Sequence, residues 1–299
     1  MNISELGRHE AYLRLYDVMM RTRIIKASQG NIDDYLRLER RLSAELIKNW
    51  RKDYTEALQE VFKLLPEGLT EDARQIILDG LSNALGPAFS YSPSVRQELR
   101  KYIREAYDKS KKEFAINGSL NLPDIKAVEV LTKHNCYWLG QHYSKHISKK
   151  IAETTQQGIL DGLGRDELAR ELRAELGGEH SNYKYWDVVS SAALVRSRAF
   201  GAISGMEEAG IVEYEILTMS DERTCPICAE MDGRSFSVEV ARKRIDAALE
   251  VEDADEFKSI FSWQTKPSTG ISNEELAEHG ENLPPFHGRC RCIVVSHMS

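Results

Sequence analysis

Residues 283–295 read LPPFHGRCRCIVV, and this stretch decides how the C-terminal part of the chain is organised. Two prolines restrict the approach to His287, and Cys290 and Cys292 follow one residue apart. Upstream, residues 225–228 read CPIC. Zinc prefers thiolate and imidazole ligands in closed tetrahedral sites. A C-x-x-C pair and an H-x-x-C pair brought together therefore predict one structural zinc ion.

The expected ligands of this ion are Cys225, Cys228, His287 and one of Cys290 or Cys292. On a strand, Cys290 and Cys292 would face the same side, so either could reach the ion. We favour Cys290, because an H-x-x-C turn brings its ligands together as tightly as C-x-x-C does, whereas Cys292 begins the apolar stretch CIVVS. The fifth cysteine, Cys136, is expected to be a small apolar residue buried within a helix.

Three other uses of the cysteines stay open: a redox pair, metal-free structural cysteines and an open catalytic zinc site. A redox C-x-x-C pair normally starts a helix in a βαβ setting, whereas Asp232-Gly233 here predicts a hairpin. A catalytic zinc would make the chain a metal-dependent nuclease or hydrolase. The acid–base groups available to such an enzyme would be Asp221, Glu222 or His279.

Composition is that of a globular protein with a sizeable core. The 299 residues are 41% hydrophobic and 29% charged, and this length allows about two domains. No run of roughly 18 apolar residues predicts a membrane span, and the first residues lack a signal pattern. We expect synthesis in a cytoplasm, where reducing conditions disfavour disulfides.

The net charge of −7 is concentrated at one end of the chain. Residues 211–299 hold 9 Lys and Arg against 17 Asp and Glu, while the preceding region is balanced. Binding to nucleic acid draws mainly on contacts from Lys and Arg to phosphates. The cysteine region is therefore a poor candidate for a DNA-reading zinc module, and a nucleic-acid-binding role for the balanced helices remains an alternative.

Up to Gly210 the sequence predicts one helix after another. Apolar spacings of three and four, with capping and stop signals, predict helices over 10–28, 32–65, 71–85, 94–116, 123–160, about 165–176 and 184–209. His142 and His146 are spaced like ligands on one of them, but H-E-x-x-H is absent, so we expect a solvated or packed pair.

After Gly210 the pattern changes. IVEYEILTM alternates apolar and charged residues, as a half-buried strand does, and SFSV and CIVVS predict two more strands. Residues 239–262 are predicted to be helical, and 264–283 to be loop with a one-turn cap at Ser272. We therefore predict a mainly α protein with a small C-terminal α+β module stapled by zinc. Its parts would be an N-terminal helical region (1–122), a helical body (123–210) and the module (211–299).

SDERTCPICAEMDGRSF and PPFHGRCRC together resemble the C-terminal signature of phage head-morphogenesis proteins, the Mu F-like minor head proteins. That family typically shows Asp-x-Arg-x-Cys-x-x-Cys, an Asp-Gly turn and Pro-Pro-x-His-x-x-Cys-Arg-Cys. The matching positions are Asp221, Arg223, Cys225, Cys228, Asp232, Gly233, Pro284, Pro285, His287, Cys290, Arg291 and Cys292. The resemblance covers roughly residues 125–299. Gly288 stands where proline is frequent, and the segment between the two halves is longer than in many members.

The resemblance implies a minor structural protein of a phage head, without catalysis, that acts in assembly at or near the portal. Some members accompany the genome on ejection. The implied partners are the portal protein and other head proteins, with packaged DNA nearby and no membrane. The implied location is the host cytoplasm during assembly and then the virion head.

The helix predicted over 184–209 is rich in small residues, which permit close helix approach. They can pack inside the same chain or against a partner, and we expect the helical body, rather than the zinc module, to make the assembly contacts. The small residues are Ser190, Ser191, Ala192, Ala193, Ala199, Gly201, Ala202, Ser204 and Gly205.

Overall fold

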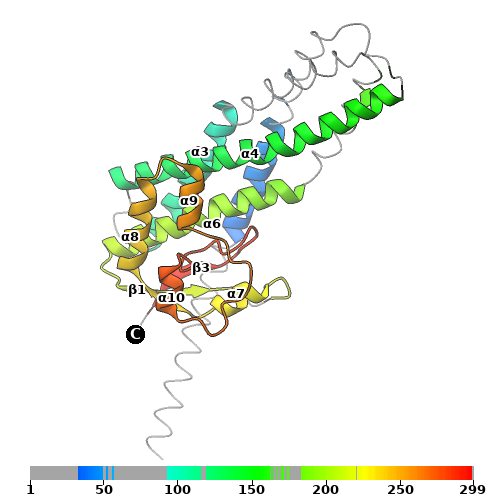
Figure 1. Ribbon diagram of the computed structural model, residues 1–299. Coiled ribbons are helices and arrows are strands. Elements are labelled where there is room, and N and C mark those ends of the chain that lie inside the picture. Colours follow the sequence, from blue (N-terminus) through cyan, green and yellow to red (C-terminus); the bar gives the residue numbers. More distant parts are fainter. Residues whose placement is uncertain are drawn as a thin grey trace, which may run out of the picture.

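The computed structural model describes residues 33–49, 52, 56, 93–115, 119–161, 163, 167, 170, 171, 174, 183–219 and 221–297. The helices predicted over 10–28 and 71–85, and most of the one over 165–176, lie outside the described residues. The elements are a helix at 33–49, α3 (Pro93–Lys112), α4 (Leu122–Leu160), α6 (Tyr183–Glu208), β1 (Glu213–Leu217), α7 (Pro226–Met231), β2 (Ser235–Ser237), α8 (Val238–Leu249), α9 (Ala254–Ile260), α10 (Asn273–Glu278) and β3 (Ile293–Ser296) (Figure 1).

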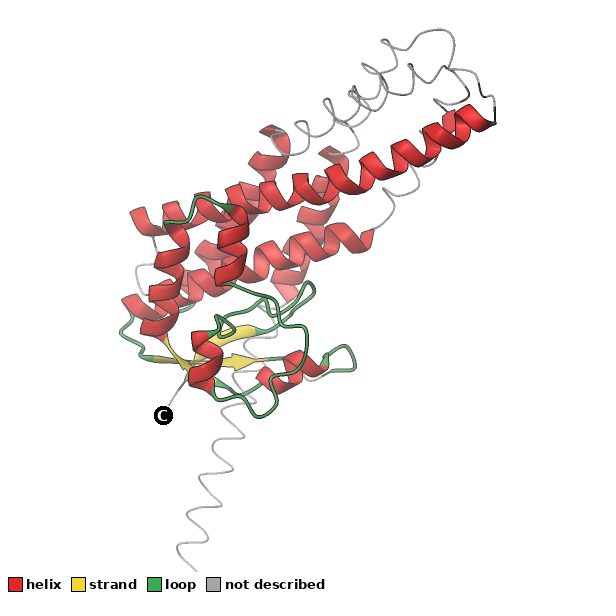
Figure 2. Ribbon diagram, viewed as in Figure 1, coloured by secondary structure: helices red, strands yellow, loops and turns green. Residues whose placement is uncertain are grey.

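The molecule is mainly helical with a small C-terminal sheet, which confirms the predicted fold class (Figure 2). The predictions over 94–116, 123–160 and 184–209 correspond to α3, α4 and α6, each within a few residues at either end except that α3 stops at Lys112. Apolar side chains three and four positions apart line one face of α3 and are fully buried, as the period of a helix requires.

Helix α6 approaches α3 closely through two glycines. A Cβ atom on Gly201 would lie 2.3 Å from the carbonyl oxygen of Tyr107, and one on Gly205 would lie 2.5 Å from that of Lys111. Ser190, Ala193, Ala199, Ala202 and Ser204 of the same helix are also buried. The small residues of 184–209 therefore serve packing inside the chain, which was one of their two expected uses.

A buried ionic cluster joins the same helices. Lys111 and Asp124 are both fully buried, and their side chains lie 2.5 Å apart. Asp124 also accepts hydrogen bonds from the hydroxyls of Tyr107 (2.8 Å) and Ser204 (2.7 Å). Burial favours the neutral carboxyl, but these donors, led by Lys111, lower the pKa of Asp124 below its usual value. The charge is thereby satisfied, and α3, α4 and α6 are held in one register.

The helix at 33–49 packs on both α3 and α6. The hydroxyl of Tyr35 donates to the carbonyl of Ala106 at 3.2 Å, and the guanidinium of Arg198 lies 4.0 Å from the centre of the Tyr35 ring. Ser43 donates to Asp187 at 3.2 Å. The buried side chains of this helix join a core that continues through α3, α4 and α6 into the C-terminal sheet.

The C-terminal part is built on a three-stranded antiparallel sheet in the order β2-β1-β3, and its strands correspond to the three predicted from the sequence. The sequence prediction was wrong at two places. Residues 239–262 form two helices, because Asp253 accepts a hydrogen bond from the N–H of Glu256 and begins α9 separately. The connection between β1 and β2, predicted as a plain hairpin, contains the short helix α7.

None of the described helices is long and apolar enough to span a membrane.

The α3–α6 contact predicts that replacing Gly201 or Gly205 by alanine destabilises the protein, although this change usually stabilises a helix. Gly to Ala normally stabilises a helix interior by about 1 kcal/mol. At Gly201 or Gly205 the added methyl meets backbone atoms, so each alanine variant should instead destabilise the protein by about 1–3 kcal/mol. Urea unfolding measures this. Glu105→Ala, on the exposed face of α3, is the control and should shift stability by less than about 0.5 kcal/mol. Stabilisation by either alanine would contradict the close approach.

Candidate metal centre

The first pair of candidate ligands lies at the start of α7. Cys225 caps this helix, and its sulfur accepts a hydrogen bond from the N–H of Cys228 at 3.4 Å. Pro226 occupies the first helical position, where a missing N–H costs nothing. The turn therefore directs both sulfurs to one point. The first cysteine does begin a helix, as in redox pairs, but the flanking strands are antiparallel, unlike a βαβ unit.

The second group of candidates comes from the loop before β3. The Nε2 atom of His287 lies 3.2 Å from the sulfur of Cys225 and 3.0 Å from that of Cys228. The sulfurs of Cys228 and Cys290 are 3.9 Å apart. Two sulfurs bound to one tetrahedral zinc, each at about 2.3 Å, lie about 3.8 Å apart. Residues separated by 59 positions, Cys228 and His287, thus meet at a spacing that suits a metal.

The candidate ligand atoms form two overlapping groups. Those of Cys225, Cys228 and His287 lie within 4.8 Å of one another, as do those of Cys228, Cys290 and Cys292. Cys228 belongs to both groups and links them. Cys228, Cys290 and Cys292 are buried, while Cys225 and His287 are partly exposed. The structure therefore brings all five sequence-predicted candidates together.

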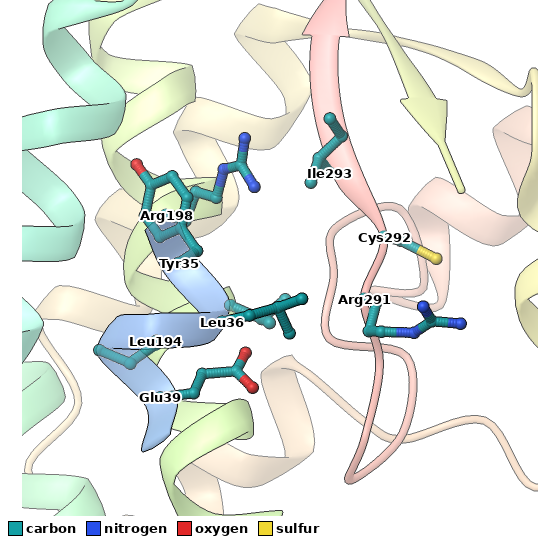
Figure 3. A pocket seen from close by; sticks show the side chains of 9 residues that line it. Tyr35, Leu36, Glu39, Leu194, Arg198, Arg291, Cys292 and Ile293 are labelled. Carbon is teal, nitrogen blue, oxygen red and sulfur yellow. The ribbon is translucent and has the colours of Figure 1, made fainter. Parts of the chain in front are cut away.

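Cys292 differs from Cys290 in its surroundings. Its sulfur donates a hydrogen bond to the hydroxyl of Thr218 at 3.4 Å. Figure 3 shows this sulfur pointing away from the helix at 33–49, in the same direction as the guanidinium of Arg291. Thr218 was missed from the sequence, because its place depends on the pairing of Leu217 with Ile293 across the sheet.

The pKa values of the Cys290 and Cys292 thiols shift in opposite directions. Burial raises the pKa of a thiol, but hydrogen bonds with Cys228 and Cys292 outweigh burial at Cys290 and hold its pKa well below the usual value. The same hydrogen bonds, with Cys228 and Cys290, raise the pKa of Cys292 well above it. These directions favour the thiolate form at Cys290 over Cys292, and the thiolate is the form that binds metal.

An ion pair ties the two halves of the motif together. Both guanidinium nitrogens of Arg291 donate to the carboxylate of Asp221, at 2.7 and 2.5 Å. The hydrogen bonds from Arg291 hold the pKa of Asp221 far below its usual range. Asp221 also accepts the N–H of Arg223 at 3.0 Å and so orders the loop that leads into α7.

The long segment between the halves is anchored by arginines. Arg234 donates to the carbonyls of Ile271 (2.9 Å) and Ser268 (3.2 Å). Arg244 donates to the carbonyls of Ile260 (3.2 Å) and Glu278 (3.0 Å), at the ends of α9 and α10. These bonds bring the segment back to the sheet and place the His287 loop beside α7.

The other residues considered from the sequence have different surroundings. Cys136 is buried, as expected, and burial raises its pKa to about 11. His279 caps the end of α10 and Glu222 is exposed. Among the described residues, the cysteine–histidine groups contain no carboxylate. His142 and His146 lie on α4, with side chains outside the described part.

The comparisons with known proteins agree with the motif. A family model described as phage Mu protein F like protein matches residues 149–295, a range that begins within α4 and ends in β3. It includes all five candidate ligands, the Asp221–Arg291 pair and helix α6. No curated protein and no solved structure matches the chain. The resemblance inferred from the cysteine motif is thereby confirmed: residues 149–295 match the family of phage Mu protein F like proteins.

Proposed function

We propose that this chain is a minor structural protein of a phage head that acts in assembly at or near the portal. The observation that carries the proposal is the convergence of both cysteine motifs within the region that matches the family. We extend the proposal to the portal protein and other head proteins as partners, and to packaged DNA as a neighbour. The protein would be in the host cytoplasm during assembly and then in the virion head, and could leave with the genome.

We further propose one structural zinc ion held by Cys225, Cys228, His287 and Cys290. The donor set supports this, because sulfur and imidazole are the preferred zinc ligands. The spacing of Cys228 and Cys290, at 3.9 Å, also fits two ligands of one ion. The Cys292 thiol, which lies in the same group, donates a hydrogen bond to Thr218, and this competing contact favours Cys290 as the fourth ligand.

A structural role for zinc is supported by the absence of acid–base groups around it. Four protein ligands leave no position for the water that a catalytic zinc activates. Asp221, the nearest candidate in the motif, is held by Arg291. The cysteine–histidine groups of the described residues include no Asp or Glu. We therefore propose a non-enzymatic role for the protein.

Metal content is the first test. Protein purified without added metal, under reducing conditions, should contain about one zinc per chain by elemental analysis. Chelation should lower the thermal unfolding temperature, because binding to the folded state contributes to stability. A folded protein that carries no zinc would refute the site, and zinc-dependent hydrolysis of DNA, nucleotides or peptides would refute the structural role.

Two matched variants test the ligand assignment. Cys290→Ser should lose most of the bound zinc, because serine is a poor ligand for it. Cys292→Ser should retain zinc near the wild-type level, since its sulfur bonds to Thr218. Zinc per chain after gel filtration measures both. Equal loss in the two variants, or greater loss in Cys292→Ser, would contradict the assignment.

The proposed place in the virion has its own test. Mass spectrometry of purified particles should find the chain in far fewer copies than the major capsid protein. Affinity purification of the chain from infected cells should recover the portal protein. The matched control is purification from the same cells of an unrelated protein carrying the same affinity tag. Particles that assemble and infect normally, and that lack the chain, would overturn a role in the head.

A further inference from the structure

A cleft opens where the helix at 33–49, α6 and the two motif loops meet. Its charged lining residues are Glu39, Arg40, Asp187, Arg223, Arg289 and Arg291. Four arginines therefore gather from three separate segments of the chain. We call this feature the arginine cleft.

Two of the four arginines form no ion pair within the described part of the chain. Arg223 does act on Glu39 of the same cleft, lowering the pKa of a carboxyl that burial raises to about 7. Arg291 is held by Asp221, and Arg289 lies 3.6 Å from Asp187, with both of those side chains about half exposed. Arg40 and Arg223 are exposed and form no ion pair with another described residue. These two guanidinium groups are therefore available to bind an oxyanion in the cleft.

The position of the cleft depends on the motif loops. Arg223 precedes Cys225 by two residues, and Arg289 and Arg291 flank Cys290. The loops that hold the candidate ligands therefore also set the spacing of three arginines. Leu36 adds an apolar wall beside them. Guanidinium groups in fixed positions bind carboxylates in pairs of hydrogen bonds, so the geometry suits carboxylate side chains.

The surroundings favour a short acidic segment over DNA. Residues 211–299 hold 9 Lys and Arg against 17 Asp and Glu, so the region that supplies three of the four arginines has a net negative charge. Duplex DNA carries about one charge per 1.7 Å of its axis, and this net charge would repel it. A few carboxylates on a peptide can reach the arginines alone. We propose that the arginine cleft docks an acidic peptide segment of a partner head protein; the identity of the partner as a head protein rests on the proposed function.

The test uses the full chain and a fluorescent peptide of alternating glutamate and alanine, with a glutamine–alanine peptide as the uncharged probe. Fluorescence anisotropy is measured at about 150 mM salt, where the Debye length is about 8 Å. The Arg40→Gln/Arg223→Gln variant should bind the glutamate peptide at least tenfold more weakly. Both side chains are exposed, so thermal unfolding should match that of the wild type.

The matched control is Arg96→Gln/Arg104→Gln, which removes two exposed arginines of α3 and the same net charge. It should bind the peptide like the wild type. Equal binding by both double variants, or no preference of the wild type for the glutamate peptide, would overturn the inference. So would binding of a duplex oligonucleotide that exceeds peptide binding and is lost in Arg40→Gln/Arg223→Gln. The peptide assay needs no other head protein, so its failure leaves the virion and metal tests untouched.

Discussion

The contact between α6 and α3 at Gly201 and Gly205 determines where the other elements lie. Because no side chain separates the two backbones there, Tyr107 and Lys111 of α3 reach across to the start of α4 and the end of α6. Helix α6 also packs against β3 and α8. One helix thus joins the helical layer to the sheet, as Figure 1 shows.

The buried ionic cluster makes this arrangement dependent on pH. Asp124 has a folded-state pKa below its usual value. It therefore contributes stability above the pKa of the unfolded chain, and this contribution is lost as pH falls through the folded value. Buried pairs of this kind add little net stability over apolar packing, but removing one partner is costly. The cluster accordingly specifies the register of α3, α4 and α6 more than it increases stability.

The same two loops supply residues to the candidate metal centre and to the arginine cleft. β1 lies in the middle of the sheet. α7 connects β1 to its neighbour β2, and the His287 loop leads into β3, the neighbour on the other side. The ion pair between Arg291 and Asp221 then links the two loops. Burial of the Cys290 sulfur on one side leaves Arg289 exposed on the other. A metal held by the cysteines would stabilise a region that is acidic and poor in strands.

The sequence by itself determined α3, α4, α6, the three strands and the candidate ligands, because these follow from local periods and from the chemistry of Cys and His. It also indicated the resemblance to phage Mu F-like proteins, through the two motif halves. It did not predict α7 or the break before α9, since a few capping bonds decide such short helices. Only the tertiary structure placed the Cys292 thiol beside Thr218, brought Gly201 and Gly205 of α6 against α3, and gathered the arginines. Those outcomes depend on strand register and on contacts between residues far apart in the chain, which no local pattern encodes.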